Sequence, residues 1–345
     1  MISVQVESLN KPLAQEIEAF LDELAQRNHS VLGYHYPFYL HMLELSGIGE
    51  ALAFVARNDE GHIVGYMPSL TKSSALGKVI SSMPFFGPNA GVLCANNEII
   101  APVLAELQRW VVEHNPISAS IYTPFEDHEA ESIYATLLPG ALRIEKFTNF
   151  IKLDSLSLSS SLMYDLRKAE KGGVVVEETS DISLVPDIYA IYIRNCEDYG
   201  IPPKPYVCVE ELVRSSASHD GTATYIARKD GQIIGALIMI YSPITASYYL
   251  PCSIHEFRSF QPTSLLIHHA MMESKKRGLA YWNWEASPSR ESGVYKFKKK
   301  WGSEDGSYSI FILPGRSKED FAHWGQQGIS SAFPFFFVYP FHLLN

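Results

Sequence analysis

Residues 53–66 read AFVARNDEGHIVGY, and residues 224–237 read TYIARKDGQIIGAL. Each stretch is an apolar run, the pair Ala-Arg, a polar turn with Asp and Gly, and a second apolar run. Asp-Gly and Asp-Glu-Gly are typical hairpin turns, because these residues tolerate the left-handed backbone that a tight turn requires. Two hairpins with matching flanks indicate a duplicated domain. The functional site should therefore be sought in what one copy has and the other lacks.

The order of the predicted elements is the same after both hairpins. Each hairpin precedes a strand, a long helix and another strand, with the helices predicted at 98–114 and 262–277. The polar, serine-rich segment 154–161 separates the two repeats. The sequence therefore predicts an α/β (α+β) fold of two tandem domains, 1–153 and 154–345, each a mixed sheet flanked by helices. We expect the first domain to shape a cleft and the second to carry the active site.

The bulk composition fits a globular protein of about two domains. The 345 residues are 46% hydrophobic and 19% charged, and the net charge is −10. A chain this acidic does not coat nucleic acid with its whole surface, so any basic site must be local. The four cysteines show no C-x-x-C spacing and no accompanying pair of histidines, which predicts reduced thiols and no metal site.

The sequence carries no targeting signal and no membrane-spanning pattern. The N-terminus, MISVQVE, lacks a basic region followed by an apolar stretch, and no run of about 18 apolar residues occurs. We therefore expect a cytoplasmic protein. The aromatic segment 333–341 reads FPFFFVYPF and is too short to span a bilayer. We expect it to pack on the body of the protein; the alternative is peripheral contact with the inner face of the membrane.

The segment 287–302 reads SPSRESGVYKFKKKWG and carries the clearest chemical signal. At helical spacing, Val294, Phe297 and Trp301 form one apolar stripe, and Lys298 is the lysine closest to it. An ammonium group at the border of an apolar face can reach a shielded site, where it stabilises developing negative charge far better than in water. The alternative is a basic, solvated helix end that the helix dipole favours.

Two further groups of residues suit anion binding. Arg167 and Lys171 are four residues apart on a predicted helix and share a face, so together they could hold a phosphate or pyrophosphate. The alternative is a helix terminus with favourable cations. Tyr249 lies on a predicted strand that leads through Arg258 into a helix beginning near Thr263, and a helix N-terminus is a ready anion site.

Together these segments resemble the FemAB-like branch of the GNAT acyltransferase superfamily, whose characterised members are peptidoglycan bridge aminoacyltransferases. The family pattern has a basic helix end followed by Gly-Val, a Tyr-Tyr strand before Pro-x-x-Leu-Leu, and the motif Ser-Gly-x-Tyr-x-Phe-Lys-x-x-Trp/Phe-Gly. The matching segments are 166–176, 248–266 and 292–302. Twin GNAT-like domains are the family's hallmark, so the resemblance spans nearly the whole chain.

The resemblance implies roles for particular residues. The family's functional lysine corresponds to Lys298, beside Phe297, and would stabilise the oxyanion formed when an amine attacks an acyl ester. A precursor phosphate would contact Arg167 or Lys171. Acetyl-CoA-dependent relatives carry a glycine-rich R/Q-x-x-G-x-G/A loop, whereas the segment 258–264 reads RSFQPTS here. The coiled-coil arm of the tRNA-using members is absent, because the linker between the repeats is short.

The leading hypothesis is a FemAB-like N-acyl or aminoacyl transferase that acts on an amine of a cell-envelope or polysaccharide precursor. Lys298 would stabilise the tetrahedral oxyanion, and Glu285 or Tyr295 would accept the amine proton. The donor would be aminoacyl-tRNA or acyl-CoA, of which tRNA is disfavoured by the net charge and the missing arm. One alternative is an acyl-CoA-dependent N-acyltransferase for an amino sugar or another small molecule. Another is a non-catalytic binding or scaffold protein of a polysaccharide assembly system.

Overall fold

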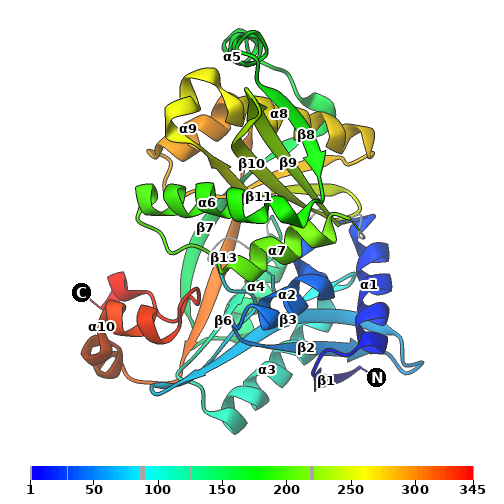
Figure 1. The fold of residues 1–345 in the computed structure, drawn as a ribbon. Coiled ribbons are helices and arrows are strands. Elements are labelled where there is room, and N and C mark those ends of the chain that lie inside the picture. The colour runs from blue at the N-terminus through cyan, green and yellow to red at the C-terminus, as the bar shows by residue number, and fades with distance from the viewer. Residues whose placement is uncertain (1, 29, 86–89, 125, 218–220, 345) are drawn as a thin grey trace. The chain divides into compact units, whose positions relative to one another are not determined.

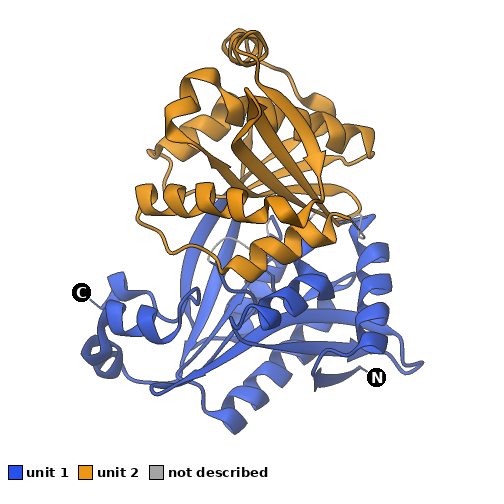
Figure 2. Cartoon of the chain, viewed as in Figure 1, with its two compact units in different colours: residues 1–148, 306–345 blue, residues 149–305 orange. Residues whose placement is uncertain are grey.

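The computed structural model describes residues 2–28, 30–85, 90–124, 126–217 and 221–344 (Figure 1). The chain forms two compact units, coloured separately in Figure 2. Unit 1 comprises Met1–Thr148 with Gly306–Asn345, and unit 2 comprises Asn149–Asp305. This division differs from the predicted domains 1–153 and 154–345, because the C-terminal residues that the sequence assigns to the second domain lie in unit 1.

Unit 1 is a mixed sheet flanked by helices. Its strands lie in the order β1 (Ser3–Glu7), β2 (Glu50–Arg57), β3 (Ile63–Ser74), β4 (Gly77–Ser81), β6 (Ser118–Tyr122) and β13 (Glu304–Pro314), and β5 (Leu93–Cys94) pairs with β3. Its helices are α1 (Lys11–Ala25), α2 (Pro37–Leu45), α3 (Ile100–His114), α4 (His128–Leu137) and α10 (Lys318–Ala332). The C-terminal residues belong to this unit because β13 pairs antiparallel with β6.

Unit 2 has the same kind of layers. Its strands lie in the order β12 (Tyr281–Ala286), β11 (Thr245–Ser253), β10 (Gln232–Tyr241), β9 (Thr222–Lys229) and β8 (Val175–Thr179), and β7 (Leu142–Lys152) begins in unit 1 and ends in unit 2. Helices α6 (Val185–Tyr199) and α7 (Tyr206–Ser215) cover one face of the sheet (Figure 1). Helices α5 (Ser160–Lys171), α8 (Pro262–Lys276) and α9 (Gly293–Lys300) contribute to the core on the other face.

The two predicted hairpins are present, as β2–β3 and β9–β10. In the second, Asp230 and Gly231 form the turn with φ of 50° and 80°, the left-handed backbone that such a turn requires. The arginine of each Ala-Arg pair has the same role: Arg57 donates to the carbonyl oxygen of Gly61 at 3.0 Å, and Arg228 donates to that of Gly231 at 3.3 Å. The repeated arginine therefore stabilises the turn that follows it in both copies.

Each unit also contains one pair of parallel strands that is joined over a short length. In unit 1, β4 pairs with β6 from Val79–Ser118 to Ser81–Ser120. In unit 2, β11 pairs with β12 only from Thr245–Tyr281 to Ser247–Asn283, although β11 continues to Ser253. Pro251 lies in this continuation, where the missing amide hydrogen costs nothing because β12 no longer pairs there. The two strands of unit 2 therefore separate at their carboxyl ends.

The aromatic C-terminal segment packs on unit 1, as we expected. Phe333, Phe336 and Tyr339 are buried, and Tyr339 stacks on Phe321 with ring centroids 4.1 Å apart. Phe335 contacts Phe85 edge to face at 5.0 Å. Membrane contact through this segment stays a prediction. In the part of the chain that the structure describes, no helix combines the length and the apolar character needed to cross a bilayer.

Candidate active site

Lys298 is a buried lysine at the carboxyl end of β12. Its helix, α9, begins at Ser292, whose hydroxyl accepts a hydrogen bond from the amide of Tyr295 at 3.2 Å. The Lys298 side chain is 3% exposed, and its Nζ donates to the carbonyl oxygens of Glu285 at 2.9 Å and Ala286 at 2.8 Å. Burial lowers the pKa of Lys298 to about 8, while the Glu285 carboxylate acts in the opposite direction.

The surroundings of Lys298 are aromatic. The rings that adjoin one another around α9 and the neighbouring strands belong to Tyr248, Trp282, Trp284, Phe297 and Trp301. Trp284 contacts Trp301 with centroids 6.0 Å apart and Phe297 at 6.3 Å. These rings exclude water, so the ammonium acts in a medium of low dielectric constant, where its field on a nearby charge is strong.

Glu285 has a strained backbone that is fixed by one neighbour. Its φ is 62°, which is uncommon for a residue with a side chain. Asn283 holds it at both ends: Asn283 Nδ2 donates to Glu285 Oε1 at 2.7 Å, and the Glu285 amide donates to Asn283 Oδ1 at 3.0 Å. Strained backbone of this kind persists where the surrounding structure imposes it, and it gathers at functional sites. One residue thus supplies a carbonyl oxygen to Lys298 and an oriented carboxylate.

A cavity of about 650 Å³ opens beside Lys298 within unit 2. It is bounded by the unpaired part of β11, the start of α8 and the first turns of α9. Its lining is mainly apolar with a few polar groups: Asn195, Tyr199, Tyr248, Pro251, Cys252, Ser253, Arg258, Gln261, Pro262, Thr263, Ser264, Gly293, Val294, Phe297 and Lys298. The predicted residues Arg258, Phe297 and Lys298 therefore share one cavity, which has the character of a small-molecule site.

The other predicted residues lie elsewhere in unit 2. Tyr295 lies on α9, but its hydroxyl donates to the carboxylate of Asp305 at 3.1 Å, and it does not line the cavity. Tyr249 is 8% exposed and likewise does not line the cavity; its neighbour on β11, Tyr248, does. Arg167 and Lys171 are exposed on α5. The structure thus brings together Lys298, Glu285, Phe297 and Arg258, and does not bring the remaining predicted residues to the cavity.

Sequence reasoning missed Lys204, which lies in the segment Ile-Pro-Pro-Lys-Pro after α6. Two tyrosines of α6 hold its backbone: Tyr189 donates to the Lys204 carbonyl oxygen at 3.0 Å, and the Lys204 amide donates to Tyr192 at 3.1 Å. The ammonium group lies 5.2 Å from the ring centre of Tyr249. Burial lowers the pKa of Lys204, and the Glu285 carboxylate is among the groups that act in the opposite direction. The three flanking prolines were the available signal, because they stiffen a loop that carries one lysine.

Asn195 was also missed, and it replaces the missing strand at the end of β11. Its Nδ2 donates to the carbonyl oxygen of Ser253 at 2.8 Å, and its Oδ1 accepts from the Ser253 amide at 2.9 Å. The Asn195 side chain therefore satisfies both backbone groups where β12 has separated from β11. A lone asparagine on a predicted helix gives no sequence signal of this contact.

We expect Asn195→Ala to destabilise unit 2, because it leaves two backbone groups of Ser253 without protein partners. The free energy of unfolding, measured in urea, should fall by about 2 kcal/mol. Asp198→Ala, on the exposed side of the same helix, is the matched control and should change it by less than about 0.5 kcal/mol. Equal stabilities of the two variants would contradict this role for Asn195.

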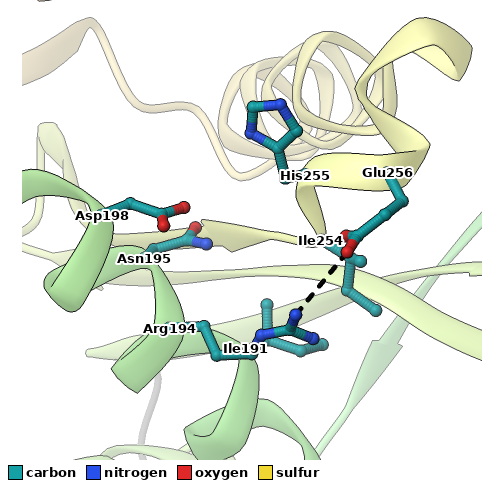
Figure 3. A pocket seen from close by; sticks show the side chains of 7 residues that line it. All are labelled: Ile191, Arg194, Asn195, Asp198, Ile254, His255 and Glu256. Atoms are coloured by element: carbon teal, nitrogen blue, oxygen red, sulfur yellow. Dashed lines mark ion pairs between the residues drawn. The ribbon is translucent and has the colours of Figure 1, made fainter.

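A second, smaller cavity of about 260 Å³ shares Asn195 with the first (Figure 3). Its charged lining residues come from α6 and from the turn after β11. Arg194 and Glu256 point toward each other, with Arg194 Nη2 3.6 Å from Glu256 Oε1. Their side chains are 67% and 63% exposed, so this pair contributes little to stability. The cavity adds polar groups next to the end of β11, but none of the predicted residues lies in it.

Residues 157–296 match the acetyltransferase (GNAT) domain family. This segment is a GNAT domain. It lies within unit 2 and contains Glu285, Lys204, Asn195 and the first part of α9. The predicted resemblance to the GNAT superfamily is therefore confirmed, and it falls on the unit that carries the cavity. No curated protein matches the sequence.

Solved structures of the same fold confirm the predicted tandem GNAT-like architecture. FemX is 13% identical, with a TM-score of 0.68 over 88% of this chain and 96% of FemX. L-PGS from Bacillus licheniformis is 11% identical, with a TM-score of 0.59 over 87% of this chain and 92% of that one. A tandem GNAT protein from the clavulanic acid biosynthesis pathway is 12% identical, with a TM-score of 0.53 over 92% and 99%. At these identities the likeness shows the fold alone.

Proposed function

We propose that this protein is an N-acyl or aminoacyl transferase that acts on an amine of a cell-envelope or polysaccharide precursor. The observation that carries the proposal is the buried Lys298 ammonium, held at the end of β12 and facing a cavity of the GNAT domain. An acyl transfer builds negative charge on the carbonyl oxygen, and a cation in a water-poor site stabilises it. The likeness in fold to FemX and L-PGS supports the cell envelope as the setting.

In the proposed reaction the acceptor amine attacks the carbonyl carbon of the acyl donor. A C–N bond forms, the carbonyl electrons move to oxygen, and Lys298 stabilises the resulting oxyanion. The amine loses one proton, for which the Glu285 carboxylate is the proposed acceptor, oriented by Asn283. Collapse of the intermediate breaks the bond to the donor oxygen or sulfur, which leaves and takes up a proton. Alignment of donor and acceptor in the cavity supplies a further part of the rate.

A second candidate donor is acyl-CoA, which the shape of the cavity favours. The cavity runs along the unpaired part of β11 to the start of α8, where Arg258, Thr263 and Ser264 offer polar groups to an anion. Helix α8 begins at Pro262, which supplies no amide hydrogen, so this end of the cavity has one donor fewer than a glycine-rich loop would offer. This candidate transfers the acyl group to an amino sugar or another small amine by the same attack.

Thermal-shift measurements with purified protein distinguish the two donors. Acetyl-CoA should raise the melting temperature if the cavity holds coenzyme A; charged tRNA together with a UDP-linked muropeptide should do so if the first proposal is correct. Product formation is then followed by mass spectrometry with the stabilising pair. If none of these compounds stabilises the protein or yields product, both transferase proposals fail and a non-catalytic binding role is favoured.

A further inference from the structure

The exposed face of α5 is basic and carries one aromatic residue. At 100° per residue, a single arc of the helix contains Tyr164, Arg167, Lys168 and Lys171, all exposed. Tyr164 is 67% exposed, although a ring of this size is usually covered. The opposite face packs into the core through Leu162, Leu166 and Ala169. In Figure 1, α5 lies at the outer end of unit 2, so this face is directed away from the unit.

The exposed face of α9 continues the same character. Lys296, Lys299 and Lys300 lie opposite the Phe297–Trp301 side of the helix and are exposed. The two helices are joined by an ion pair, in which Lys300 Nζ lies 2.6 Å from Asp165 Oδ2. We call the seven exposed residues of these two arcs the α5–α9 surface: Tyr164, Arg167, Lys168, Lys171, Lys296, Lys299 and Lys300.

This surface is not explained by stability. Within the described residues, Arg167, Lys168, Lys171 and Lys296 make no ion pair with an acidic group. The helix dipole favours cations in a last helical turn, but it does not account for an exposed Tyr164 among them. Six cations also stand out in a chain whose net charge is −10, because the rest of the surface must be correspondingly more acidic. An anionic partner would therefore meet the protein on this side and be repelled elsewhere.

The α5–α9 surface also adjoins the cavity. Val294, at the start of α9, lines the cavity and is 44% exposed. The last turn of α5 reaches the segment before α8, because a Cβ added to Gly172 would lie 2.8 Å from Cδ1 of Phe260. A partner held on this surface would thus lie near the entrance through which substrate reaches Lys298.

We propose that the α5–α9 surface docks unit 2 on a membrane rich in anionic phospholipid. Each lysine or arginine near such a membrane adds to the attraction, and six cations give a strong combined effect. Tyrosine settles at the level of the lipid headgroups, where its ring is apolar and its hydroxyl is solvated. An RNA would use the same cations, but it gives no reason for the combination of exposed Tyr164 and Val294 beside the cavity. This inference does not depend on the identity of the acyl donor.

Sedimentation of the whole protein with vesicles tests the proposal. The protein should bind vesicles that contain phosphatidylglycerol and should not bind vesicles of phosphatidylcholine alone. Neutralising three cations, in Lys168→Gln/Lys171→Gln/Lys296→Gln, should weaken binding on the order of 100-fold, since each cation contributes about fivefold. Tyr164→Ser should weaken it further without any change in charge.

A matched control removes three cations from other helices, in Lys11→Gln/Lys276→Gln/Lys318→Gln, and should reduce vesicle binding by less than about threefold. Equal losses in both triple variants would overturn the proposal, because the attraction would then follow net charge alone. Binding of an RNA duplex is measured in parallel. If the α5–α9 variant loses RNA but binds vesicles as well as the unmodified protein, the surface is a nucleic-acid site and the membrane proposal is wrong.

Discussion

Lys298→Met should lower kcat by about 10²- to 10³-fold, with a much smaller change in KM. Removal of one group that stabilises an oxyanion has an effect of this size, because the interaction is stronger in the transition state than in the bound substrate. Methionine is a suitable replacement, since it is unbranched and apolar and fits the aromatic surroundings of Lys298. The measurement is steady-state kinetics with the donor and acceptor that give product, together with circular dichroism to show that the variant is folded.

Lys276→Met is the matched control for this experiment. Lys276 is an exposed lysine on α8 that does not line the cavity, so kcat should stay within about twofold of the unmodified protein. The proposed role also predicts a pH dependence. Because the pKa of Lys298 is lowered to about 8, its charged form is lost above that pH and kcat/KM should fall there. A folded Lys298→Met variant with undiminished turnover would eliminate the proposed role.

The second large effect concerns stability against pH. The pKa of Lys298 is about 8 in the folded protein and 10.5 for an ordinary lysine, so between these values the unfolded chain binds more protons than the folded one. The free energy of unfolding therefore gains a contribution as pH rises from about 8 to 10.5. That contribution is fully present above 10.5 and is lost as pH falls through about 8. Its size is roughly 3 kcal/mol, from 1.36 kcal/mol for each pKa unit.

The comparison between variants isolates this contribution. We expect the difference in unfolding free energy between the unmodified protein and Lys298→Met to change by roughly 3 kcal/mol across this pH range, in the direction that favours the unmodified protein at high pH. Urea unfolding at several pH values measures it, and Lys276→Met should show a constant difference. Glu285→Gln should move the transition to lower pH, because the Glu285 carboxylate raises the pKa of Lys298. A flat difference for Lys298→Met would show that this lysine titrates normally.

The sequence was sufficient where local chemistry decides the structure. The Asp230-Gly231 turn follows from the residues themselves, since both adopt the left-handed backbone. The position of Lys298 follows from helical spacing in 287–302, because a side chain next to an apolar stripe is drawn under it when the helix packs. The same spacing could not show which groups would receive the ammonium, since the carbonyl oxygens of Glu285 and Ala286 lie on another element.

Several features of the site depend on contacts between distant residues. Asn195 and Ser253 are far apart in the chain, and nothing in either neighbourhood indicates that they bond. Lys204 approaches Tyr249 only because α6 and β11 are packed together. Tyr295 shows the opposite error: its motif is right, but Asp305 receives its hydroxyl on the side of α9 away from the cavity. Helical position alone does not reveal such a partner.

The discontinuity of unit 1 affects how the chain folds as it is synthesised. Residues Asn149–Asp305 are contiguous, so unit 2 has all of its sequence before β13 leaves the ribosome. Unit 1 remains incomplete until then, and β6 presents an unpaired edge because its partner is the last strand to be made. The unit with the buried lysine is therefore able to fold first. The unit that begins the chain is the one exposed to mispairing with other nascent chains.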